Sequence, residues 1–223
     1  MYKDEKKLQT GSVNSVDKNP QIKEPSRLAF LATVGELHTR PLRYDLKTLQ
    51  NTILELAPDL LCVEVTREAW ENNDLSDSII EVKKALWPLS LASDIVVVPI
   101  ASSKKKYSDF WPVTRLSGRL SRSLNRMLWW GILRADSIEA INGYLFGSFC
   151  HVICNINNKT WTAENRKIWE KQNEEMAGKI IHAVNRDAGR RVLVVVQCQR
   201  IHSLLSLVKK NLKNAKITSY KKL

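Results

Sequence analysis

The stretch Leu28-Ala-Phe-Leu-Ala-Thr-Val-Gly-Glu-Leu-His-Thr-Arg40 decides the fold that the sequence predicts. It opens as an almost continuous apolar run, and such a run ended by a glycine is typical of a strand buried on both faces of a sheet. Gly35 lets the backbone leave the strand in a conformation that other residues resist. Ligands of open α/β sheets bind just beyond the carboxyl ends of the strands. We therefore expect Glu36, a proton acceptor, and His38, a titratable imidazole, to lie in a catalytic or binding position.

Three more apolar runs of strand length follow, and helical patterns separate them. They cover residues 60–65, 94–100 and 191–196, and a short last strand is expected at residues 217–220. A strand, a helix and a strand in close succession imply a right-handed parallel crossover. The sequence therefore predicts an α/β fold with a mostly parallel central sheet of four or five strands flanked by helices.

The length of 223 residues suits one α/β domain better than two independent domains. Residues 1–25 are polar, which predicts a flexible N-terminal arm. Residues 26–223 are expected to form the domain. Within it, residues 109–160 are rich in aromatic side chains and carry no strand pattern, so we expect a helical insertion that covers one end of the sheet.

The formal net charge of +12 favours anionic partners, such as nucleic acid or an acidic membrane. Much of this charge occurs where tails and solvated helix faces place it, so these partners are not the favoured ones. Five arginines at helix-like intervals could still form a basic stripe that binds phosphates. They are Arg115, Arg119, Arg122, Arg126 and Arg134.

The four cysteines do not suggest a disulfide framework. Cys150 and Cys154 lie one helical turn apart, which indicates a buried helix face rather than a metal site. The N-terminus lacks the apolar core of a signal peptide, and no run approaches the length that spans a membrane. A soluble protein of the reducing cytoplasm is the expectation.

Two further polar residues follow apolar runs in the same way as Glu36 and His38. Glu64 ends the second run, and a carboxylate there is costly to bury without a partner. His202 follows the fourth run. Because the carboxyl ends of parallel strands meet at one edge, we expect all four side chains to share a cleft, although a polar loop or an ordinary helix start would also account for them.

Several short motifs occur in an order that resembles a known superfamily. The strand motifs are Gly35-Glu-Leu-His38, Pro58-Asp-Leu-Leu-Cys-Val-Glu64 and Val194-Val-Val-Gln-Cys-Gln-Arg-Ile-His202. Between them, Glu81 with Ala85 is similar to an E-x-x-x-A step, and Gln172–Ile180 is similar to a conserved polar helix. The superfamily joins the TraB/PrgY pheromone-shutdown proteins, the Tiki metalloproteases, the ChaN-like lipoproteins and the erythromycin esterases, and the resemblance spans about residues 27–220.

The chain departs from the family pattern at three positions. Gln199 stands where the second G-x-x-H motif has its glycine, and Gln172 stands where the polar helix has an arginine. Ala101 stands where the third strand often leads into an aspartate. These changes leave the order of the motifs intact.

The resemblance implies a hydrolase that cleaves an ester or amide bond in a small molecule or peptide. In a Tiki-like site, His38, Glu64 and His202 bind a divalent metal (Zn, Mn, Co or Fe), with Glu36 nearby. Two imidazoles and a carboxylate leave a coordination position open for water, whose pKa the metal lowers.

Other branches of the superfamily imply different chemistry. In an esterase-like site no metal is needed, and His38 or His202 is the general base, oriented by a carboxylate such as Glu64. A ChaN-like protein binds haem and catalyses nothing. Binding of nucleic acid or an acidic membrane through the arginine stripe is a third class of function.

Overall fold

The computed structural model describes residues 24–103, 107–110, 115–186, 189–213 and 215–223. Five parallel strands form one sheet in the order β3-β2-β4-β1-β5. They are β1 Ser26–Thr33, β2 Leu60–Thr66, β3 Val96–Ala101, β4 Arg191–Gln197 and β5 Ala215–Ile217. The predicted α/β fold with a parallel sheet is confirmed, whereas residues 1–23 of the predicted arm lie outside the described residues.

The burial of the strands follows their place in the sheet. β1, β2 and β4 occupy the middle and are buried along nearly their whole length, as their unbroken apolar runs predict. β3 and β5 form the two edges and are only partly buried. The last strand starts at Ala215 rather than at residue 217, and Tyr220 instead begins a 3₁₀ turn.

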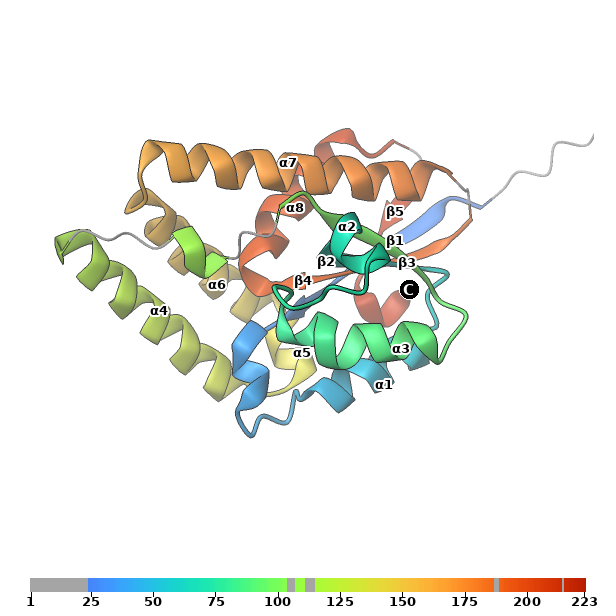
Figure 1. Ribbon diagram of the computed structural model, residues 1–223, viewed down its shortest axis with the longest axis horizontal. Helices are drawn as coiled ribbons and strands as arrows, with labels where there is room; N and C mark the ends of the chain where they lie inside the picture. Colours follow the sequence, from blue (N-terminus) through green and yellow to red (C-terminus); the bar gives the residue numbers. More distant parts are fainter. Residues whose placement is uncertain (1–23, 104–106, 111–114, 187–188, 214) are drawn as a thin grey trace, which may run out of the picture.

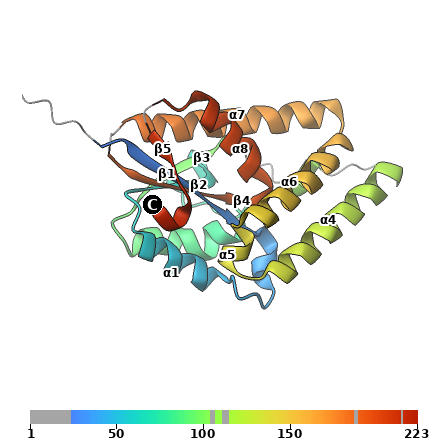
Figure 2. The same ribbon diagram turned by 180° about the vertical axis from the view of Figure 1, so that it is seen from behind.

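Helices cover both faces of the sheet (Figures 1 and 2). One face packs on α7 and α8, and the other packs on α1 and α3. The α-helices are α1 Leu46–Leu56, α2 Arg67–Glu71, α3 Trp87–Leu91, α4 Arg115–Ala135, α5 Ile138–Ile141, α6 Tyr144–Lys159, α7 Ala163–Arg186 and α8 Cys198–Asn211. Shorter turns are η1 Gly35–Thr39, η2 Val82–Leu86, η3 Tyr107–Phe110 and η4 Tyr220–Lys222, of which η2 is π-helical.

The apolar spacing of residues 78–91 predicts one helix, and the structure divides this segment into two. The π-helical turn η2 follows Glu81 directly and runs into α3. Pro88 lies within the first two positions of α3, where a missing N–H costs nothing. Single π-turns occur often at functional sites, and Glu81 is the residue directly before this one.

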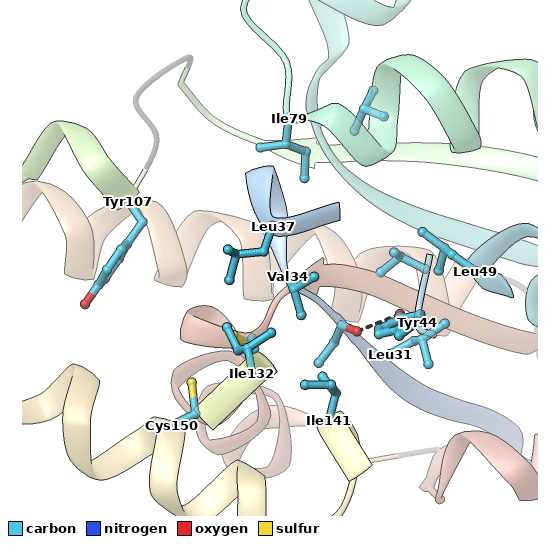
Figure 3. Packing of buried hydrophobic residues seen from close by; sticks show 14 of the residues in the cluster. Leu31, Val34, Leu37, Tyr44, Leu49, Ile79, Tyr107, Ile132, Ile141 and Cys150 are labelled. Carbon is cyan, nitrogen blue, oxygen red and sulfur yellow. Dashed lines mark hydrogen bonds between the residues drawn. The ribbon is translucent and has the colours of Figure 1, made fainter. Parts of the chain in front are cut away.

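Residues expected to be helical between β3 and α7 form α4, α5 and α6. Figure 3 places Ile132 of α4 and Cys150 of α6 beside Val34 and Leu37, which follow β1. These helices therefore pack against the carboxyl end of β1.

All four cysteines are buried and none forms a disulfide. Cys150 and Cys154 lie on the inner face of α6, as their spacing predicts. In the described part of the chain, none of the helices combines the length and the apolar composition that crossing a bilayer requires.

Candidate functional site

Gly35 follows β1, at the side of the sheet where the carboxyl ends of the strands lie. Its backbone has a φ of +63°, in the left-handed region that favours glycine. Its N–H donates a hydrogen bond of 2.6 Å to Oε1 of Glu81. On its other side, Oε1 of Gln197 lies 3.4 Å from where a Cβ would stand. Two polar networks therefore meet at this glycine.

The first network is a buried pair formed by His38 and Glu81. Nε2 of His38 lies 3.5 Å from Oε1 of Glu81, and both side chains are 0% exposed. Burial raises the pKa of Glu81 to about 7 and lowers the pKa of His38 to about 4. Tyr44 packs edge-on against the imidazole and is held by a hydrogen bond from its hydroxyl to the Ala32 carbonyl (Figure 3). At a pH between about 4 and 7, both groups are therefore mostly neutral: His38 is deprotonated and Glu81 is protonated.

This pair also carries polar atoms that make no well-formed hydrogen bond, although the Tyr44 backbone lies close to the His38 ring and the Thr33 hydroxyl lies close to the Glu81 carboxyl. Among the described residues, both ring nitrogens of His38, Oε2 of Glu81 and Oγ1 of Thr33 are buried without a well-formed hydrogen bond. Leaving such atoms unpaired is costly, and native proteins keep them where water, a ligand or a reaction uses them. The end of β1 is therefore the candidate position for a bound water, a ligand or a catalytic reaction.

The second network surrounds Glu64, at the end of β2. Its Oε1 accepts a hydrogen bond of 2.5 Å from Nε of Arg200, and its Oε2 accepts one of 3.1 Å from the Gln197 N–H. The side chains of Glu64 and Arg200 are 7% and 3% exposed. The carboxylate that the sequence marked as costly to bury is thus paired with a cation and a backbone N–H.

Arg200 is itself held on three sides. Its two terminal nitrogens donate to Oδ1 of Asn173 at 2.8 Å and to Oε1 of Gln172 at 3.1 Å. The guanidinium also lies 3.9 Å from the centre of the Trp169 ring, a cation–π contact. An arginine at position 172, which the family pattern expects, would set a second positive charge beside Arg200 instead of an acceptor.

A small cavity of about 40 Å³ lies at the carboxyl ends of β2, β3 and β4. Polar side chains form much of its wall, among them Glu64, Thr66, Ser102, Gln197 and Arg200. A buried water needs about 10–15 Å³ of such volume, so this cavity holds a few waters or a small polar group. Its place is the one where open parallel sheets bind ligands.

The structure places the four predicted site residues in separate surroundings. His38 pairs with Glu81, and Glu64 pairs with Arg200. Glu36 is exposed on η1. His202 is exposed on α8, where its ring stacks on His151 with 3.4 Å between centroids. His202 also lines a separate cavity of about 400 Å³ between α6, α7 and α8.

The expected metal and haem sites do not fit these surroundings. Within the described residues no three His, Cys, Asp or Glu side chains form a group that could hold a metal ion, so His38, Glu64 and His202 do not form one. The Glu64 carboxylate is already paired with the Arg200 guanidinium, which a metal ion would have to displace. The larger cavity contains His202 but is lined mainly by polar and charged side chains, which do not suit the apolar faces of haem.

Two residues of the site were not named as site residues from the sequence. Glu81 interrupts the apolar run of residues 79–82, and the argument used for Glu64, that an isolated carboxylate in such a run needs a partner, would have found it. Arg200 gave no such signal, because the helix was expected to start near His202. In the structure α8 begins at Cys198, which places Arg200 in its first turn, beside the sheet edge.

Replacement of Gly35 by alanine is expected to destabilise the protein by about 1–2 kcal/mol, the cost of a left-handed backbone for a residue with a Cβ. The added methyl group meets Gln197 only at ordinary contact distance, so the backbone conformation sets the cost. Urea denaturation measures it. The matched control is Gly147→Ala in α6, where a Cβ meets nothing within 4 Å and the substitution is expected to be neutral or stabilising. Equal effects at the two positions would contradict the argument.

Comparison with known proteins adds no relative to this picture. No family model matches the chain. No curated protein matches it, and no solved structure matches it. The resemblance to the TraB and Tiki superfamily therefore rests on the sequence motifs.

Proposed function

We propose that the chain is a metal-independent hydrolase of ester or amide bonds, in which His38 is the general base and Glu81 orients it. The observation that carries the proposal is the buried His38–Glu81 pair at the carboxyl edge of the sheet, in which Nε2 of His38 lies 3.5 Å from Oε1 of Glu81 and neither ring nitrogen makes a well-formed hydrogen bond. Imidazole–carboxylate pairs of this kind activate water in many hydrolytic enzymes. In the esterase-like alternative of the sequence resemblance, His38 is one of the two candidate general bases.

In this mechanism His38 takes a proton from a water while the water oxygen bonds to the acyl carbon. Ionised Glu81, 3.5 Å away, stabilises the imidazolium that forms. His38 then gives the proton to the leaving oxygen or nitrogen as the bond to the acyl carbon breaks. The competent form has neutral His38 and ionised Glu81, so kcat/KM is expected to rise with pH and to level off above about 7.

The second network supplies positive charge to the developing oxyanion. The described contacts occupy three of the five N–H groups of Arg200. The cavity beside it is also lined by Gln197, whose side chain lies next to Gly35. Fixed donors at such a position stabilise a tetrahedral intermediate. Because His38 and Glu81 are fully covered in this structure, the substrate reaches them only when η1 and the loop that follows it move.

The test is a panel of chromogenic esters and peptides with the wild type and His38→Asn. We expect the substitution to lower kcat/KM by about a hundredfold or more, the usual contribution of a general base. His182→Asn is the matched control, since His182 is exposed on α7 and belongs to neither of the two polar networks. Failure of the wild type to hydrolyse either class, or an unchanged rate in His38→Asn, would contradict the proposal.

A second candidate is a non-catalytic protein of the same fold that binds a small polar ligand. The observation in its favour is that the cavity reaches Glu64 and Arg200, whereas the His38 side chain is 0% exposed. Such a protein would bind polar small molecules with a calorimetric signal that Arg200→Met abolishes, and it would release them unchanged.

A further inference from the structure

The exposed faces of α4 and α6 carry an unusual amount of apolar surface. Of the twelve large apolar side chains that the described residues expose, nine lie on these two helices. The α4–α6 surface is defined here by six of these nine side chains. These are Met127, Trp130, Leu133, Tyr144, Leu145 and Val152.

These exposed side chains do not belong to the hydrophobic core, because other residues of the same helices form the buried face. The core-facing side of α4 is buried through Leu124, Leu128 and Ile132. α4 and α6 lie antiparallel, because Ser121 near the start of α4 donates to Asn157 near the end of α6 at 2.6 Å. α4 forms one border of the molecule in both views (Figures 1 and 2). The exposed apolar side chains therefore face outward, on helices that already have a complete inner face.

The same surface is basic and contains no acid. Neither α4 nor α6 has an Asp or Glu in its sequence. Four arginines of α4 are exposed: Arg119, Arg122, Arg126 and Arg134. Residues three and four apart share a helix face, so Arg126 lies on the same face as Trp129 and Trp130. Cations and aromatic rings are interleaved here, and the Arg134 guanidinium lies 4.9 Å from the centre of the Trp130 ring.

We propose that the α4–α6 surface docks onto a membrane surface that contains anionic lipids. Arginines attract the lipid phosphates and carboxylates, while tryptophan, tyrosine and aliphatic side chains enter the boundary between headgroups and acyl chains. The surface lies in the plane of the interface and does not cross the bilayer.

Other occupants match this surface less well. Nucleic acid would pair with the arginines but would leave aliphatic side chains such as Leu145, which is 84% exposed, in water. A second copy of the chain would bring the arginines of two α4 helices together without an acidic group on either helix. An anionic lipid surface satisfies both the charge and the apolar area.

Vesicle co-sedimentation of the full chain tests the charge component. We expect binding to vesicles of about three parts phosphatidylcholine to one part phosphatidylserine, weaker binding at high salt, and little binding to phosphatidylcholine alone. Arg122→Glu with Arg126→Glu is expected to weaken binding by about tenfold or more, because each basic residue contributes severalfold. Lys209→Glu with Lys210→Glu, on the exposed end of α8, changes the net charge equally and is the matched control, expected to lose far less.

The apolar component has its own variant. Trp130→Ser with Leu133→Ser is expected to weaken binding by about tenfold, whereas Leu91→Ser, at an exposed leucine of α3, is expected to leave it unchanged. Circular dichroism and urea denaturation establish that each variant is folded. No binding to acidic vesicles by the wild type, or equal loss in the α8 control, would overturn the proposal. So would tighter binding to an RNA oligonucleotide that the Trp130 and Leu133 substitutions leave unchanged.

Discussion

Replacement of Arg200 by methionine is expected to lower the free energy of unfolding by about 3–5 kcal/mol, the cost of leaving a buried ion pair with one partner. Glu64 is then a buried carboxylate whose remaining partner is the Gln197 N–H. Asn173 and Gln172 lose a charged donor at the same time. Methionine keeps a similar length and apolar stem, so the loss reports the charge and the hydrogen bonds rather than a cavity.

The double variant shows which part of this loss comes from the stranded carboxylate. Adding Glu64→Gln to Arg200→Met removes the buried charge, and we expect it to recover a large share of the stability, since replacing both partners of a buried pair costs much less than removing one. Urea denaturation of the two single variants and the double variant gives the coupling energy. Lys209→Met, an exposed cation on the same helix, is the control and should change stability by about 0.5 kcal/mol or less. A similar loss there, or no rescue in the double variant, would contradict the assigned pair.

The parallel sheet could be predicted because the apolar runs that form β1, β2 and β4 are too continuous for half-exposed strands. The same logic predicted that His38 and Glu64 lie at the carboxyl ends of the strands, and in the structure both do. His38 lies beside Glu81, which accepts a hydrogen bond from the Gly35 N–H. Glu64 accepts one from the Gln197 N–H, and the Gln197 side chain lies next to Gly35. What the apolar pattern could not predict was the partner of each. Glu81 comes from a turn 46 residues beyond Gly35, and Arg200 lies 136 residues beyond Glu64, so only the tertiary fold brings them together.

The different surroundings of Arg200 and His202 follow from where α8 begins. The helix starts at Cys198, directly after β4. Two residues along an α-helix correspond to a rotation of about 200°, so when Arg200 points toward Glu64, His202 points to the opposite side. It meets His151 of α6 there. The helix begins about four residues before His202, where its start was expected, and this difference places Arg200 rather than His202 beside Glu64.

The His38–Glu81 pair is expected to hide a strong pH dependence that single substitutions reveal. The pKa of His38 is lowered from 6.5 to about 4 by burial, and the pKa of Glu81 is raised from 4.5 to about 7 by burial. Between about pH 4.5 and 6.5 the unfolded pair carries one proton, on His38, and the folded pair also carries one, on Glu81. Because both states bind the same number of protons, the intact pair adds almost no slope to stability in this range.

Each single variant leaves one group with its own slope, and the two slopes have opposite signs. In Glu81→Gln only His38 titrates; its folded pKa is the lower one, so stability is lost as pH falls from about 6.5 to about 4. In His38→Asn only Glu81 titrates; its folded pKa is the higher one, so stability is lost as pH rises from about 4.5 to about 7. Each change amounts to about 3 kcal/mol across its window. Urea denaturation at a series of pH values, taken as the difference between each variant and the wild type, removes the contribution of all other groups. Curves that run parallel in all three proteins would mean that His38 and Glu81 are not buried as a pair, and the general base of the proposed hydrolase would lose its support.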